Sequence, residues 1–205
     1  GMRAFTPFDL TPDNIVETAS AYHFLDYEWA GYRDVTFDVA FVVARFPAFL
    51  AAQPFSAQAT EAFVDAWVRE VRDVWPSVQQ PDTLQARITA ALIGWAMSSV
   101  ALLDPLSLSE LAEHDEQLRA DFAAAGVDVP SPDLDGALEA CVSGPNSAHD
   151  VLRPHSQGPF TVDEALVRRD LRETFESLAA FANTGADPAY RTIYEFAQSL
   201  AERLR

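Results

Sequence analysis

The stretch Asp9-Leu-Thr-Pro-Asp-Asn14 places a carboxylate and an amide on either side of a proline, close to the start of the sequence. Asp and Asn are common in turns and Pro12 favours one, so an ordinary turn is the first interpretation. The same Asp-x-x-x-x-Asn spacing is found in catalytic loops of phosphoryl transfer, where the Asp orients an acceptor hydroxyl and the Asn holds Mg²⁺. This stretch alone leaves both interpretations open.

The next residues predict a small β-hairpin. Ile15-Val16 and Tyr22-His-Phe-Leu25 are short runs rich in β-forming residues, and a more polar segment separates them. Such a hairpin would bring Asp26, at its end, back to face Asn14. Carboxylate and amide oxygens are hard ligands of the kind that Mg²⁺ prefers. We therefore expect Asn14 and Asp26 to hold one metal ion.

Two further acids follow the predicted hairpin. Asp38 precedes the apolar run 39–46, which predicts a buried helix. Its carboxylate either accepts backbone hydrogen bonds from the loop at residues 9–14 and fixes its shape, or serves as an ordinary helix N-cap. Glu28 is either a further carboxylate near the metal or an exposed acid at the strand end.

Together these motifs resemble the aminoglycoside phosphotransferase and choline kinase family, relatives of the protein kinases. The family pattern is His-Gly-Asp-Leu-x-Pro-x-Asn, then Ile-Asp-Trp/Tyr-Glu, then Asp-Leu/Val-Ala. The corresponding stretches here are Pro7-Phe8-Asp9-Leu10-Thr11-Pro12-Asp13-Asn14, Leu25-Asp26-Tyr27-Glu28 and Asp38-Val39-Ala40. The resemblance covers about the first 45 residues. It implies Asp9 as the catalytic base, Asn14 and Asp26 as magnesium ligands, Asp38 as the structural support of the loop, and Mg²⁺ and ATP as cofactors.

The sequence departs from the family in two respects. Pro7 and Phe8 replace the family's His and Gly, and all 14 basic residues are arginine, so no lysine can pair with nucleotide phosphates. We expect a helical C-terminal lobe without the nucleotide-binding lobe, inactive alone, whose missing half comes from upstream coding sequence or a partner chain. The alternative is a non-catalytic binding or assembly module derived from such a kinase, for which we expect a homodimer.

Charge and composition restrict the partners. The net charge of −17 argues against nucleic acid or an anionic membrane as a partner. The acidity either suits a small cationic or amine-containing substrate, which the resemblance also implies, or simply keeps the protein soluble. No apolar run is long enough to cross a membrane, and a lone Cys141 suits a reducing compartment, so we expect a cytoplasmic protein.

The rest of the chain shows helical periodicity, which predicts a mainly α fold: the helical large lobe of a kinase-like protein with one small N-terminal hairpin. We expect a single domain with a catalytic-loop and metal-motif region at 1–45, a helical core at 60–125, a loop-rich connection at 126–160 and closing helices at 161–205. Within it we expect an amphipathic helix over 60–75, with Phe63, Trp67, Val71 and Val74 on one face. A central buried helix should follow, with a stripe formed by Leu84, Ile88, Leu92, Trp95, Ser99 and Leu102. We also expect a capped helix from Ser107, a short helix over 134–142, and two closing helices that begin at Thr161 and Asp187.

Overall fold

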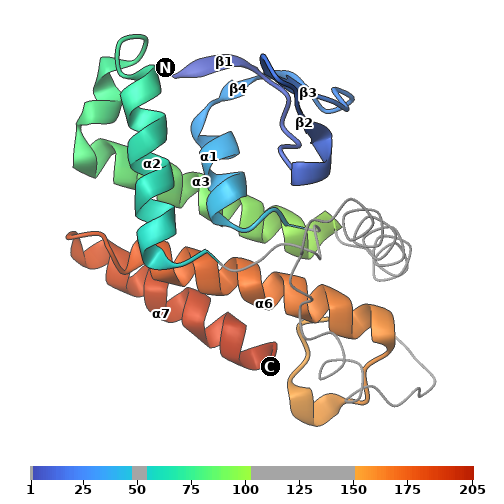
Figure 1. Cartoon of the computed structure of the whole chain (residues 1–205). Helices are drawn as coiled ribbons and strands as arrows, with labels where there is room; N and C mark the ends of the chain where they lie inside the picture. Colours follow the sequence, from blue (N-terminus) through green and yellow to red (C-terminus); the bar gives the residue numbers. More distant parts are fainter. Residues whose placement is uncertain (1, 48–54, 103–150) are drawn as a thin grey trace.

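The computed structural model describes residues 2–47, 55–102 and 151–205, and it is mainly helical (Figure 1). This confirms the predicted mainly α fold with a small hairpin near the N-terminus. The elements in chain order are β1 (Arg3–Thr6), η1 (Pro12–Asn14), β2 (Ile15–Glu17), β3 (Tyr22–Phe24), β4 (Gly31–Asp34), α1 (Thr36–Val43), α2 (Ala57–Val71), η2 (Pro76–Gln79), α3 (Pro81–Leu102), η3 (His155–Gln157), α6 (Val162–Ala182) and α7 (Pro188–Arg203).

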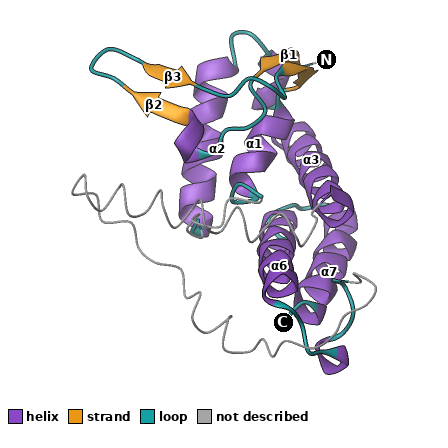
Figure 2. Ribbon diagram, turned by 90° about the vertical axis from the view of Figure 1, so that its right-hand side faces the viewer, coloured by secondary structure: helices purple, strands orange, loops and turns teal. Residues whose placement is uncertain are grey.

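Two antiparallel strand pairs stand beside the helices. The predicted hairpin is β2 with β3, in a register that pairs Ile15 with Phe24. The second pair, β1 with β4, aligns Arg3 with Asp34 and was not predicted, because its strands are separated by the whole hairpin. The loop at residues 9–14 connects β1 to β2, so it lies between the two pairs. Figure 2 shows β2 and β3 projecting away from the helical body.

Helix α1 begins differently from the prediction. Asp34 accepts hydrogen bonds from the backbone N–H of Thr36 (3.1 Å) and from its hydroxyl (2.7 Å), and it also forms an ion pair with Arg87. The N-cap position itself is Val35. Asp38 therefore lies inside the first turn, and the alternative that it caps the helix is wrong. The carboxylate that satisfies the start of the helix is that of Asp34.

Helix α1 ends at Val43, before the end of the apolar run. Arg45 and Phe46 follow with φ angles of 68° and 55°, in the left-handed region that side chains other than glycine rarely adopt. Tertiary contacts hold this turn, since the Arg45 Nε donates to the Ser177 hydroxyl of α6 (3.0 Å). The turn at Arg45 and Phe46 therefore directs the chain away from α1, at the place where Arg45 contacts α6.

Helix α3 is the central helix of the body, as predicted. Ile88 and Leu92 are fully buried, and α3 packs against both α1 and α6. Trp95 is half-buried, and its indole N–H donates to the carbonyl oxygen of Phe37 in α1 (2.9 Å). This hydrogen bond satisfies the polar edge of the ring while its faces pack against aromatic neighbours.

Helix α2 begins at Ala57, three residues before the predicted start, and it also ends before the predicted end. It ends at Val71, and Val74 lies beyond it with 67% of its surface exposed. The remaining predicted face, Phe63, Trp67 and Val71, packs half-buried against the core. In the sequence, Val74 keeps the apolar spacing of the helix, so the predicted helix extended past the residue where α2 ends. The chain leaves the helix after Val71, before η2.

Helices α6 and α7 form an antiparallel pair along one side of the body (Figure 1). A capping box begins α6: Glu164 N–H donates to the Thr161 hydroxyl (3.1 Å), and Thr161 N–H donates to the Glu164 carboxylate (2.9 Å). Asp187 caps α7 by accepting from Ala189 N–H (2.8 Å). Both predicted starts are confirmed. The predicted buried face of α6 is also confirmed, with Val167, Leu171, Phe175, Leu178 and Ala182 all buried.

Some predictions fall outside the described residues. These are the helix after Ser107, the short helix over 134–142 and the surroundings of Cys141. Among the helices that the structure describes, none has the length and apolar character needed to cross a membrane.

Candidate active site

The loop at residues 9–14 is held by a short chain of hydrogen bonds. Asp9 Oδ1 accepts from both the backbone N–H of Thr11 (3.1 Å) and its hydroxyl (2.9 Å). Asn14 Nδ2 in turn donates to the Thr11 Oγ1 (3.2 Å), and Asn14 N–H donates to the Thr11 carbonyl (3.0 Å). The buried Thr11 therefore ties the candidate base to the candidate metal ligand. The two candidate side chains share one hydrogen-bonded unit.

Phe8 shapes the start of this loop. Its φ angle is 77°, a conformation that costs glycine nothing and strains other residues. The Phe8 ring stacks on Trp95 of α3, with centroids 4.8 Å apart and planes at 26°, and the Arg33 guanidinium lies 4.0 Å above the ring centroid. Because stacking and cation–π contacts stabilise the ring, tertiary contacts offset the backbone strain. The family pattern has glycine at this position.

The hairpin brings Asn14 and the chain just before Asp26 together. Leu25 N–H donates to the Asn14 carbonyl (2.8 Å), one step beyond the Ile15–Phe24 pair. Asp26 follows directly, exposed, with a left-handed φ of 48° that Asp tolerates better than most residues. Asn14 and Asp26 thus lie at the same end of the hairpin, next to the loop that carries Asp9.

The donor set at this end suits Mg²⁺ in its chemistry. Asn14 uses its Nδ2 towards Thr11, which leaves its Oδ1 as an oxygen donor, and Asp26 offers an exposed carboxylate. Magnesium is usually held by one or two carboxylates together with waters and substrate phosphates, so two protein ligands are enough. Over the ranges that the structure describes, no three His, Cys, Asp or Glu side chains gather as a metal-binding group.

Glu28 lies apart from the hairpin strands. Strand β3 ends at Phe24, and Glu28 sits in a turn that Ala30 N–H closes on the Tyr27 carbonyl (3.0 Å). Because the strand ends before both Asp26 and Glu28, no strand geometry places the two side chains on the same side. Glu28 is an exposed acid of this turn.

Asp38 lies beneath the start of the loop. Burial raises its pKa from 3.8 to about 6, while the Thr6 hydroxyl and the Arg33 guanidinium favour the charged form. Among the described residues, neither Asp38 Oδ1 nor Thr6 Oγ1, both buried, makes a hydrogen bond of good geometry. Asp38 therefore lies near Thr6, at the end of β1, and its support of the loop stays a prediction. The backbone bonds of residues 9–14 described above go to other partners.

Sequence analysis missed three residues of this site. Thr11 is the centre of the hydrogen-bond chain, and the Thr at the second position after Asp9 is a recognisable signal for such a turn. Arg33 and Trp95 pack on Phe8 from β4 and α3. Their positions next to Phe8 depend on the β1–β4 pairing and on helix packing, and no local sequence pattern predicts either.

Comparisons of the chain with protein-family models, with curated proteins and with solved structures found no match.

Proposed function

We propose that this chain is the C-terminal lobe of an ATP-dependent small-molecule phosphotransferase, of the kind its motifs resemble. The observation that carries the proposal is the single hydrogen-bonded unit from Asp9 through Thr11 to Asn14, which the hairpin places beside Asp26. A second observation supports it. Phe8 holds a positive φ, a conformation that glycine, the residue of the resembled pattern at this position, adopts without strain.

Under this proposal Asp9 positions the acceptor hydroxyl and takes its proton. Its Oδ1 is fixed by Thr11, and within the described part of the chain its Oδ2 makes no hydrogen bond. Asn14 Oδ1 and the Asp26 carboxylate would hold Mg²⁺, which when bound neutralises phosphate charge. Positioning and charge neutralisation provide most of the catalysis in phosphoryl transfer, so a rigid loop suits the task.

The proposed reaction needs groups from outside these 205 residues. They contain no lysine, and arginine is a poor replacement for a lysine that pairs with nucleotide phosphates. We therefore expect this polypeptide alone to transfer no phosphate from ATP in the presence of Mg²⁺. Measurable transfer that Asp9→Asn abolishes would contradict this expectation and would leave the assigned role of Asp9 intact.

Paramagnetic Mn²⁺ tests the metal site without requiring activity. At a low ratio of Mn²⁺ to protein, we expect the amide NMR signals of Asn14, Leu25 and Asp26 to broaden first. Asp26→Asn should remove this selective broadening. Asp73→Asn is the matched control, because it removes one exposed carboxylate from the turn after α2, far from the hairpin in the sequence.

Two results of this titration would contradict the proposed metal site. One is broadening spread over the acidic surface without preference for the hairpin end. The other is selective broadening that Asp26→Asn leaves unchanged. A positive result would support the metal ligands independently of any enzyme assay.

The alternative, a non-catalytic assembly module, is favoured by one specific observation. Phe5, Trp29 and Tyr32 on or beside the β1–β4 pair are 56%, 63% and 72% exposed, and Tyr22 and Tyr27 in the hairpin region are exposed as well. Clustered aromatic surface of this kind marks interaction sites. Under this alternative a second copy of the chain covers these residues.

Light scattering at micromolar concentration tests this alternative. We expect a dimer mass for the unmodified chain and a shift towards the monomer for Trp29→Ser combined with Tyr32→Ser. A clean monomer mass for the unmodified chain would reject self-association and would leave the phosphotransferase proposal untouched.

A further inference from the structure

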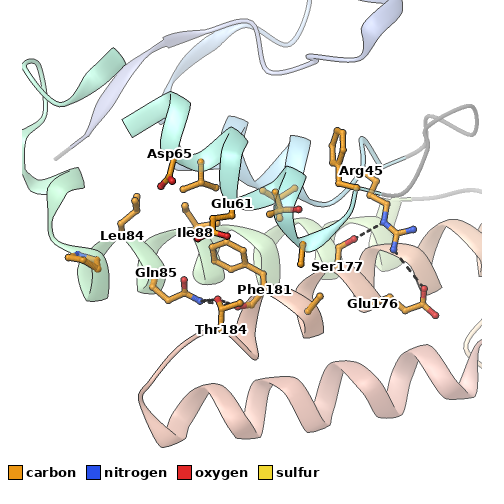
Figure 3. Close-up of a pocket in the computed structure, with 17 residues that line it drawn as sticks. Arg45, Glu61, Asp65, Leu84, Gln85, Ile88, Glu176, Ser177, Phe181 and Thr184 are labelled. Atoms are coloured by element: carbon orange, nitrogen blue, oxygen red, sulfur yellow. Dashed lines mark hydrogen bonds and ion pairs between the residues drawn. The ribbon is translucent and has the colours of Figure 1, made fainter. Parts of the chain in front are cut away.

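A cavity of about 520 Å³ lies among α2, α3, α6 and the end of α1 (Figure 3). Its volume falls within the range of small-molecule sites in proteins. Its deepest walls are apolar, because Val43, Leu84, Ile88 and Phe181 line it and are themselves buried. A ligand in this cavity would therefore bury an apolar body.

The polar groups on the α6 side of the cavity are already paired. Arg45 donates to Ser177 (3.0 Å) and forms ion pairs with Glu173 (3.7 Å) and Glu176 (3.9 Å). Gln85 on α3 donates to the Phe181 carbonyl (2.9 Å) and to the Thr184 hydroxyl (3.2 Å). Figure 3 shows Arg45 turned towards Ser177 and Glu176, and Gln85 turned towards Thr184.

The α2 side has a different character. Glu61 and Asp65 are one helical turn apart on the same face, and both line the cavity. Within the ranges that the structure describes, neither carboxylate forms an ion pair, and like charges at this spacing repel each other. Among the described residues that line the cavity, Arg45 is the only cation, and two other carboxylates already engage it. The cavity therefore presents uncompensated negative charge at one wall.

We propose that this cavity binds an organic cation with an apolar body and a single ammonium group. The body would contact Val43, Leu84, Ile88 and Phe181, and the ammonium would lie towards Glu61 and Asp65. The site is separate from the candidate active site: α3 lines the cavity only with residues at its start, whereas the loop at residues 9–14 meets α3 near Trp95. The proposal is independent of the phosphotransferase function.

Three probes that share one apolar body test the proposal: phenylbutylamine, phenylbutanol and phenylbutanoate. They carry a positive charge, no charge and a negative charge at neutral pH. Titration of the full chain followed by NMR should show saturable shifts of α2, α3 and α6 amides. We expect the amine to bind about fivefold more tightly than the alcohol, as for a partly exposed ion pair, and the acid to bind most weakly.

Matched variants locate the effect. The double variant Glu61→Gln, Asp65→Asn should abolish the preference for the amine and keep binding of the alcohol. The double variant Glu70→Gln, Asp73→Asn removes the same charge from exposed positions that do not line the cavity, and the preference should survive. Ala180→Trp, at an exposed lining position, should block all three probes by filling the entrance.

Several outcomes would overturn the proposal. These are equal binding of the three probes, a preference that survives Glu61→Gln with Asp65→Asn, binding that Ala180→Trp leaves unchanged, and an absence of saturable shifts. A fall of the preference in 0.5 M salt would support it further, because exposed ion pairs are screened.

Discussion

The two strand pairs and the α6–α7 pair differ in how they use their apolar side chains. On α6, the residues at helical spacing face the body and are buried, and both helices begin with a side-chain cap. On the strand pairs, several aromatic side chains remain exposed, and Phe8 and Asp26, in the loops next to the strands, hold left-handed backbone angles.

This difference follows from the backbone. A helix satisfies its interior hydrogen bonds within itself, so its stability needs only one buried face. A two-stranded sheet leaves an edge of unpaired groups on each strand and is marginal by itself. The candidate active site lies in the region that depends most on contacts from elsewhere, as binding and catalytic loops commonly do.

The largest expected effect is the loss of a buried ring from α6. Phe175→Ala removes a fully buried side chain from the core, and we expect a loss of about 3–5 kcal/mol in the free energy of unfolding. Phe5→Ala, at an exposed ring of β1, should cost less than about 1 kcal/mol. Urea denaturation followed by circular dichroism measures both. Equal losses would contradict the contrast between the two regions.

The next effect concerns pH and Asp38. Its folded pKa of about 6 lies above the ordinary value of 3.8, so the neutral form stabilises the fold fully at low pH and this contribution is lost as the pH rises through 6. The full loss is up to about 3 kcal/mol. Asp38→Asn should therefore be more stable than the unmodified chain at pH 8, by about 1 kcal/mol more than at pH 5.

Denaturant unfolding at the two pH values checks this prediction. A variant that is less stable than the unmodified chain at pH 8 would show instead that the ionised carboxylate supports the loop, as the sequence interpretation expected.

The turn between α6 and α7 provides a third test. An added Cβ at Gly185 would overlap Cδ2 of the Tyr190 ring. We expect Gly185→Ala to cost about 1–3 kcal/mol by overpacking. In a Tyr190→Ala background the same substitution should cost almost nothing. If the cost is unchanged in that background, contact with the Tyr190 ring is not its cause.

The smallest expected losses of stability come from replacing either of two threonines whose side chains accept hydrogen bonds near the start of an element. Thr161→Val removes half of the α6 capping box and should cost about 1 kcal/mol of global stability. Thr11→Val removes the centre of the loop network, and we expect a global change below about 0.5 kcal/mol with faster hydrogen exchange at Asn14. A global loss from Thr11→Val as large as that from Thr161→Val would show that the loop unfolds together with the helices.

The helical part of the fold could largely be predicted because its signals are local. Thr161 and Glu164 are three residues apart, and the buried positions of α6 recur at helical spacing. Val74 marks the limit of this reasoning, because spacing alone does not show where a helix stops.

The candidate site was only partly predictable. The turn at residues 9–14 and the hairpin are local, so Asp9, Asn14 and Asp26 were found from the sequence. Thr11 could have been recognised from turn chemistry, whereas Arg33 and Trp95 could not, since each reaches Phe8 from a distant part of the chain.

The sequence by itself determined the helical class, the starts of α6 and α7 and the hairpin, because hydrogen bonds between near neighbours and periodic apolar faces specify them. Only the tertiary structure decided the β1–β4 pairing, the burial of Asp38, the strained angle of Phe8 and the cavity beside α2. The physical reason is that each of these depends on contacts between residues far apart in the chain, and such contacts leave no local pattern.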